Sequence, residues 1–232
     1  MEKKYYEAYD DRYRQVHQDN LQWFADEPSP IVGEVLERFG IPKSAKILEI
    51  GCGEGRDAIA LMQSGYNVLA TDVSPAAIEY ARNRFPGYGE QFRVLDCLKE
   101  SLCEKFDFLY AIAVVHMLVP QADRDGFYCF IRDTLKEDGL ALIGTMGDGE
   151  MELQSDVSRA FECQERIHEQ TGKEVHIART SCRMVHWNHF REEILRNGLT
   201  IVESGTTSVE PDFPAMMYAV VKKRKPCYNF SK

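Results

Sequence analysis

The stretch KILEIGCGEGRDAIAL, Lys46 to Leu61, places three glycines at alternate positions directly after an apolar run that contains one acid, Glu49. The run has the composition of a short buried strand, and the segment from residue 57 to residue 65 has the pattern of a helix. A loop with so few side chains either turns sharply or lets another group approach its backbone. The apolar segment 67–72 follows as a second strand, so the sequence predicts a strand–helix–strand unit here.

Strands and helices continue to alternate along the chain. Further strands are expected over 91–96, 106–114 and 139–146, and an amphipathic helix over 123–139. Ser74 and Pro75 have the pattern of an N-cap and first residue of another helix. The last two strands are expected over 199–209 and 215–223. The pattern predicts an α/β protein with a Rossmann-like, doubly wound, seven-stranded and mostly parallel sheet whose last strand is antiparallel.

Four segments are expected within this arrangement. Residues 1–40 would form an N-terminal helical cap, 41–146 the α/β core, 147–185 an insertion, and 186–232 the helix and strand pair that complete the domain. The insertion is acidic and rich in helix-forming residues, with at most one strand near 174–180, so we predict a helical lid. The helix after it is expected to begin with Asn188 as its N-cap.

Composition excludes several classes of function. The chain has 28 Lys and Arg against 37 Asp and Glu, a net charge of −9, which repels a phosphate backbone, so no nucleic acid partner is expected. No apolar run approaches a membrane span or a secretory signal, so we expect a cytoplasmic protein without a membrane partner. The seven cysteines form no CxxC pair. Reduced thiols and no metal site are therefore expected, whereas no pattern predicts an oligomeric state.

The glycine loop and Asp72 together predict a nucleoside site. Ligands of open parallel sheets bind at the carboxyl ends of the strands, where this loop is expected. Asp72 ends the second strand, where a carboxylate can accept hydrogen bonds from ribose hydroxyls, although it can also be a neighbour of a helix cap. A dinucleotide fingerprint would need a third glycine at position 56, which is Arg56. Arg56 and Asp57 are expected to form an ion pair at the start of the helix.

The segment EIGCGEG, residues 49–55, resembles the first motif of the class I S-adenosylmethionine-dependent methyltransferases, an acid followed by GxGxG. The resemblance implies S-adenosylmethionine as cofactor and S-adenosylhomocysteine as product. It implies that Glu49 neutralises the methionine ammonium group, that Asp72 binds the ribose hydroxyls, and that Asp96 meets the adenine amino group. The other implied contacts of the cofactor are Gly51, Cys52 and Gly53 in the loop, Val73, Ser74, Cys97 and Leu98 around the adenine, and Ala111 and Ile112 beside the methionine moiety.

The tyrosine-rich N-terminus resembles the segment that precedes the cofactor domain in bacterial small-molecule methyltransferases of the tellurite-resistance and thiopurine methyltransferase type. In those enzymes an aromatic residue folds over the cofactor, which implies that role for Tyr13, with Tyr9 and Trp23 behind it. The alternative is a stripe of aromatic residues on the core face of a helix. The resemblance implies a small-molecule methyl acceptor.

Two histidines are candidates for catalysis. Methyl transfer is an in-line displacement, and it needs a base only when the acceptor arrives protonated. His116, after the fourth strand, and His186, before a predicted helix, can each accept a proton near neutral pH. The alternatives are a packing or cofactor-wall role for His116 and a hydrophobic staple for His186. Arg179 and Arg183 can clamp an acidic acceptor or pair with neighbouring acids.

Other classes of function stay open. Cys163 and Cys182 in the insertion would serve a metalloid methyltransferase that binds arsenic or tellurium through thiols, although they have no pairing signature. A nicotinamide-dependent oxidoreductase, or a module that binds a cofactor without catalysis, would use the same kind of sheet.

Overall fold

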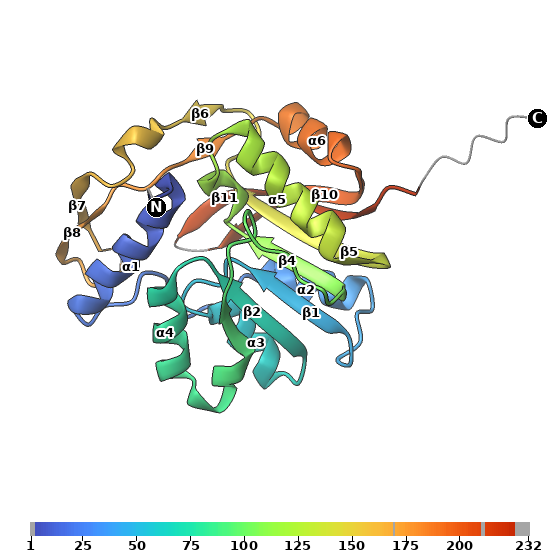
Figure 1. Cartoon of the computed structure of the whole chain (residues 1–232), viewed down its shortest axis with the longest axis horizontal. Coiled ribbons are helices and arrows are strands. Elements are labelled where there is room, and N and C mark those ends of the chain that lie inside the picture. The colour runs from blue at the N-terminus through green and yellow to red at the C-terminus, as the bar shows by residue number, and fades with distance from the viewer. Residues whose placement is uncertain (1–2, 169, 210–211, 226–232) are drawn as a thin grey trace, which may run out of the picture.

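The computed structural model describes residues 3–168, 170–209 and 212–225 of the chain, and Figure 1 shows its elements. The α-helices are α1 (Ala8–Gln18), α2 (Pro30–Arg38), α3 (Arg56–Gln63), α4 (Pro75–Arg84), α5 (Gln121–Thr134) and α6 (Trp187–Arg196). The strands are β1 (Lys46–Ile50), β2 (Asn67–Asp72), β3 (Phe92–Val94), β4 (Phe106–Ile112), β5 (Leu135–Met146), β6 (Leu153–Gln154), β7 (Cys163–Ile167), β8 (Glu174–Ala178), β9 (Arg183–Met184), β10 (Leu199–Val209) and β11 (Phe213–Lys223). Short 3₁₀ turns are η1 (Tyr5–Glu7), η2 (Pro86–Gln91), η3 (Val115–Met117) and η4 (Val157–Arg159).

A seven-stranded sheet forms the centre of the molecule, in the order β10-β11-β5-β4-β1-β2-β3. The pairs β1–β2, β1–β4, β2–β3 and β4–β5 are parallel, and β11 is antiparallel to both β5 and β10. The predicted sheet is therefore confirmed, including its antiparallel last strand. The carboxyl ends of β1, β2 and β4 lie at one edge, and the order reverses at β1.

The core lies on both faces of this sheet. Along β4, Phe108 and Tyr110 belong to one buried cluster, and Leu109 and Ala111 belong to the other. Residues from α2, α3 and α4 complete the first cluster, and residues from α5 and α6 complete the second. A central strand covered on both faces needs apolar residues at successive positions, which explains the apolar runs of β1 and β4. In the described part of the chain, no helix is both long and apolar enough to cross a membrane.

The prediction of a helical insertion is wrong. The described residues of segment 147–185 contain two small antiparallel sheets, β6–β9 and β7–β8, and the 3₁₀ turn η4, but no α-helix. The strand expected near 174–180 is confirmed as β8, in which Val175 and Ile177 are buried and alternate with exposed residues. These two side chains pack against Val16 of α1 and Leu21, so contacts with the N-terminal helix override the helix propensity of the segment. Figure 1 shows α1 beside the β7–β8 ribbon.

Two helix starts test the predictions of caps. Ser74 is the N-cap of α4 and Pro75 lies in the first turn, as predicted. The Ser74 hydroxyl accepts a hydrogen bond from the Ala77 amide. The predicted cap of α6 is wrong by two residues, because His186 rather than Asn188 is the N-cap and its Nδ1 accepts from the His189 amide. The four-segment division stays a prediction, and its ends at 1–2 and 226–232 lie outside the described residues.

Candidate active site

The glycine loop joins the end of β1 to the start of α3. The amides of Gly51 and Cys52 donate hydrogen bonds to the Thr71 carbonyl, at 2.7 and 2.9 Å, so the loop is tied to β2. Gly53 has a φ of +53°, and a Cβ on it would lie 2.6 Å from the Tyr13 hydroxyl. Glycine is therefore required here both by the left-handed backbone and by the close approach of a side chain from α1.

Asp72 connects this loop to the end of β2. It is buried, with 8% of its surface exposed, and its two carboxylate oxygens accept from the amides of Gly53 and Ser74, both at 2.8 Å. Burial raises the pKa of Asp72 to about 6, although the amide hydrogen bonds act in the opposite direction. The carboxylate thus orders the loop and also faces the cavity that the loop borders.

One cavity lies over the carboxyl ends of β1, β2 and β4, and most of the predicted cofactor residues line it. These are Tyr13, Glu49, Gly51, Cys52, Gly53, Asp72, Val73, Asp96, Cys97, Leu98 and Ile112. Ser74 and Ala111 do not line it. The Ser74 hydroxyl donates to Asp10 at 2.7 Å, and Ala111 packs in the core on the other side of β4 from Ile112. The individual cofactor contacts stay predictions.

Glu49 is a buried acid on the wall of this cavity. It is 3% exposed, and one oxygen accepts from the Tyr110 hydroxyl at 2.9 Å. Burial, followed by the nearby Asp57 carboxylate, raises the pKa of Glu49 well above its usual range. A cationic ligand in the cavity would favour the ionised form of this acid.

The cavity wall carries more acids than bases. Glu49, Asp57, Asp72 and Asp96 line it, against the single guanidinium of Arg56. Hydroxyl, amino and ammonium groups are the donors that such carboxylates bind, whereas a diphosphate would be repelled. The residues present therefore fit S-adenosylmethionine, which carries those donors, better than they fit a dinucleotide.

Two acids without a predicted role, Glu54 and Asp10, attach the N-terminal segment to the glycine loop and to the start of α4. Glu54 is buried and accepts hydrogen bonds from the amides of Trp23, at 2.8 and 3.0 Å, and Phe24, at 3.0 Å, and it pairs with His17 at 2.8 Å. On α1, Asp10 accepts from the Ala76 amide at the start of α4, at 2.9 Å. An acid within a glycine loop was the available signal for Glu54.

The expected pair of Arg56 and Asp57 is largely replaced by other partners. Asp57 accepts from the amide and hydroxyl of Ser29, at 2.6 and 2.8 Å. Arg56 donates to Asp212 at 2.7 Å, whereas its separation from Asp57 is 4.0 Å. The predicted ion pair is therefore present at the longest distance of an ion pair, and the closer partners were missed because they are distant in sequence, one before α2 and the other before β11.

A second cavity adjoins the first. Tyr9, Phe24, Met117 and Phe213 line both, so these four side chains form a common wall. The N-terminal segment and the insertion contribute most of the rest of the second cavity, together with η3 and the ends of β5 and β11. Its further lining includes Arg12, Trp23, His116, Met146, Arg166, Arg179, Cys182 and Asp212. The two cavities are thus neighbours that share a wall of large side chains.

The two predicted catalytic histidines differ in position. His116 lines the second cavity, is 4% exposed, and its Nδ1 has no hydrogen-bond partner among the described residues. Burial, then the charges of Arg124 and Arg12, lower the pKa of His116 to about 3, so it is neutral at neutral pH. His186 lines neither cavity; it caps α6 and lies 3.5 Å from Glu152.

The thiols of the insertion are not brought together in one cavity. Cys182 lines the second cavity and Cys163 does not, and both are free, as are the other cysteines of the described residues. Arg183 is also separate, because it donates to the Val119 carbonyl at 2.9 Å and to Gln121. Arg179 is the member of the predicted arginine pair that reaches the second cavity.

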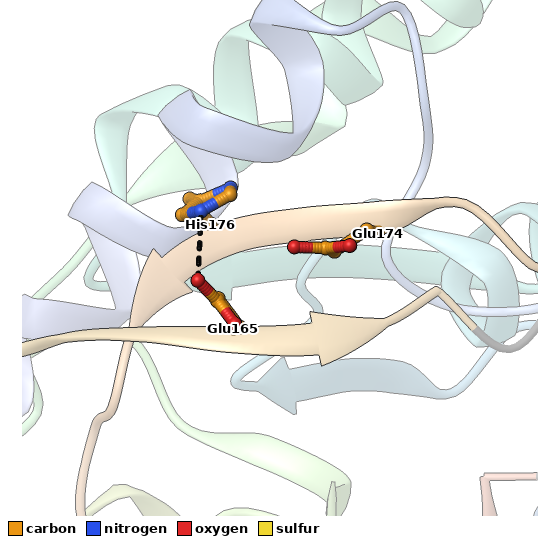
Figure 2. Close-up of side chains that lie close together, drawn as sticks. All are labelled: Glu165, Glu174 and His176. Carbon is orange, nitrogen blue, oxygen red and sulfur yellow. Dashed lines mark ion pairs between the residues drawn. The ribbon is translucent and has the colours of Figure 1, made fainter.

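Figure 2 shows a group with metal-ligand side chains on the β7–β8 ribbon, Glu165, Glu174 and His176. All three are exposed. Glu165 and His176 are opposite each other in the register, and their side chains lie 3.4 Å apart. A cross-strand pair of this kind accounts for the arrangement, so we assign these side chains to the ribbon rather than to a metal site.

Known proteins are similar to this chain over the segment that contains the glycine loop. Residues 48–141 match a family model described as a methyltransferase domain. Over 132 residues the chain is 26% identical to malonyl-(acyl-carrier protein) O-methyltransferase of Acetivibrio thermocellus. The aligned segment covers 55% of this chain and 46% of that protein. The chain spans about half or less of the length of the curated relatives that it matches.

Solved structures extend the likeness to the whole fold. The 1,6-didemethyltoxoflavin-N1-methyltransferase of Burkholderia thailandensis is 16% identical, with a TM-score of 0.68 over 97% of this chain and 92% of that chain. A TehB-like S-adenosylmethionine-dependent methyltransferase of Corynebacterium glutamicum is 22% identical, with a TM-score of 0.55 over 94% of this chain and 98% of that one. The resemblance expected from the glycine motif is confirmed: residues 48–141 match a methyltransferase domain, and the chain has the fold of solved S-adenosylmethionine-dependent methyltransferases.

Proposed function

We propose that this protein transfers a methyl group from S-adenosylmethionine to a small-molecule acceptor and releases S-adenosylhomocysteine. The observation that carries the proposal is the pair of adjoining cavities. One is lined by carboxylates at the glycine loop, and the other shares its aromatic wall. When bound in the first cavity, S-adenosylmethionine supplies an electrophilic methyl group.

The residues of the first cavity would hold the donor by charge and hydrogen bonds. We assign Glu49 to the ammonium group, Asp72 to the ribose hydroxyls and Asp96 to the adenine amino group. In support, Asp96 and Tyr6 both line this cavity, and the Tyr6 hydroxyl donates to Asp96 at 3.0 Å, so a residue of the N-terminal cap already orients this acid. Tyr13 covers the loop from α1, which supports the role expected of it.

The residues of the common wall would orient the two molecules. Tyr9, Phe24, Met117 and Phe213 are large side chains that exclude water where the cavities meet, and much of the rate of such a displacement comes from holding donor and acceptor in line. With a pKa of about 3, His116 is a weak base, so we assign it to accepting a hydrogen bond from the acceptor. The catalytic assignment of His186 gains no support from its position.

The N-terminal cap and the insertion together cover the acceptor cavity in this proposal. Arg12 donates to the carbonyls of Ala178 and Arg179, and the Tyr9 hydroxyl donates to the Ser181 carbonyl at 2.6 Å. These bonds support treating α1 and β8 as one cover. The small-molecule acceptor is further supported by the solved relative described with bound 1,6-didemethyltoxoflavin and S-adenosylhomocysteine.

Calorimetry with S-adenosylhomocysteine and with NADH tests the donor assignment. We expect S-adenosylhomocysteine to bind and NADH not to bind, and we expect Asp72→Asn to weaken the former. Preference for NADH would instead support an oxidoreductase. Incubation with methyl-labelled S-adenosylmethionine and a cell extract tests the acceptor: label in the small-molecule fraction supports the proposal, and label on protein or nucleic acid contradicts it.

A further inference from the structure

The second cavity has an excess of positive charge, although the whole chain has a net charge of −9. Three arginines line it, Arg12 from α1, Arg166 from β7 and Arg179 after β8. The one carboxylate in the lining belongs to Asp212, which is already paired with Arg56 at 2.7 Å. The charge of the three guanidinium groups is therefore largely uncompensated within the cavity.

Arg12 is the most buried of the three. It is 7% exposed, and its Nε and Nη2 donate to backbone carbonyls and the Thr180 hydroxyl, whereas Nη1 makes no hydrogen bond within the described residues. No carboxylate of the described residues lies within ion-pair distance of it. A buried guanidinium without a counter-charge is unfavourable unless an anion approaches it.

Arg166 and Arg179 extend the positive surface. Arg166 forms no ion pair among the described residues, and its guanidinium lies 5.7 Å from the centre of the Trp23 ring, over which Arg12 also lies, at 4.7 Å. Arg179 has only a distant acid, Glu162 at 3.8 Å. Trp23 thus holds two guanidinium groups on one ring, and an oxyanion between them could accept charge-assisted hydrogen bonds from both.

Aromatic side chains gather on one side of this cavity, whereas polar residues such as Gln164, Thr180 and Ser181 line other parts of it. Tyr9, Phe24 and Phe213 lie between the arginines and the first cavity, since they border both. A planar, apolar body would pack against these rings while its charged end reached the guanidinium groups. The polar and apolar parts of the cavity are thus arranged for a molecule with an anionic end.

We propose, on the basis of the proposed function, that the methyl acceptor is a small planar molecule with a carboxylate or phosphate group, which Arg12, Arg166 and Arg179 bind. The anionic group lies in the second cavity and the atom that receives the methyl group lies at the common wall.

Binding of matched probes tests the proposal. Calorimetry is carried out on the full chain saturated with S-adenosylhomocysteine, using benzoate, phenyl phosphate and neutral benzamide. We expect at least one of the two anions to bind, and benzamide to bind roughly tenfold more weakly or not at all. The reason is that a hydrogen bond to a charged group changes the dissociation constant by about tenfold or more. Arg166→Gln and Arg179→Gln should each lower the affinity for the anion by roughly tenfold.

A control variant removes one charge elsewhere. Arg93 is exposed on β3, at the opposite edge of the sheet from β10, and Arg93→Gln should leave anion binding unchanged. Binding of S-adenosylhomocysteine with no preference for either anion over benzamide would overturn this inference and leave the methyltransferase proposal intact. Failure of S-adenosylhomocysteine to bind at all would instead contradict the proposed function.

Discussion

Asp72 links the pH of the solution to binding in the first cavity. Its pKa is raised to about 6 by burial, so the carboxylate gains a proton as the pH falls through that value. A protonated acid is a poorer acceptor for ligand hydroxyls, and we expect the affinity for S-adenosylhomocysteine to fall as the pH decreases from about 8 to about 5. Calorimetry across this range measures it.

The matched variant for this prediction is Asp72→Asn. It cannot ionise, so the affinity should be lower at neutral pH, by roughly tenfold or more, and the dependence near pH 6 should disappear. An unchanged pH dependence in the variant would mean that another group titrates. Glu49, which lines the same cavity and whose pKa burial also raises, would be examined next.

At the scale of elements, Glu54 attaches the N-terminal segment to the glycine loop. Both carboxylate oxygens of Glu54 accept hydrogen bonds from backbone amides. Glu54→Gln replaces one of these oxygens by an NH₂ group, which cannot accept a hydrogen bond. We expect it to destabilise the fold by about 1–3 kcal/mol and to raise hydrogen exchange at the amides of Trp23 and Phe24.

The control for this change is Glu34→Gln, since Glu34 is exposed on α2 and its ion-pair partner Arg38 lies at 3.6 Å. That variant should leave the exchange of the two amides as it is. Full protection of Trp23 and Phe24 in the Glu54 variant would show that aromatic packing, rather than this carboxylate, positions the segment.

A second acid joins α5 to α6. The Glu193 carboxylate accepts hydrogen bonds from Nε and Nη2 of Arg124, both at 2.7 Å. Both side chains are fully buried. Glu193→Gln leaves the buried guanidinium without its counter-charge, so we expect a loss of about 3–5 kcal/mol in the free energy of unfolding, measured by chemical denaturation. The exposed pair of Lys223 and Glu137 provides the comparison, because Glu137→Gln should cost about 1 kcal/mol or less.

For the whole molecule, His116 couples acid stability to the way the elements meet. Burial and the charges of Arg124 on α5 and Arg12 on α1 lower its pKa to about 3. The unfolded chain therefore takes up this proton first, near the ordinary value of 6.5, and the folded state loses stability as the pH falls from there toward 3.

We expect His116→Gln to reduce this loss of stability, by as much as roughly 4 kcal/mol at the acid end. Denaturation curves of the two proteins between about pH 7 and pH 4 measure the difference. Parallel curves would show that the unpartnered Nδ1 is not a source of acid lability.

The sequence by itself determined the sheet and the position of the first cavity. The strand–loop–helix pattern of Lys46–Leu61, the apolar runs of β2 and β4 and the cap at Ser74 are local signals, and they place Glu49, Gly53 and Asp72 at one edge of a parallel sheet. These signals depend on hydrophobic period and backbone conformation, which neighbouring residues specify.

Only the tertiary structure decided the insertion and the second cavity. The helix-forming residues 163–167 are the strand β7 because they pair with β8, whose Val175 and Ile177 pack against α1. Arg12 meets Arg166 and Arg179 across more than 150 positions of sequence. Burial, counter-charge and partners of this kind depend on segments that are distant in the chain, and no local pattern specifies which of them meet.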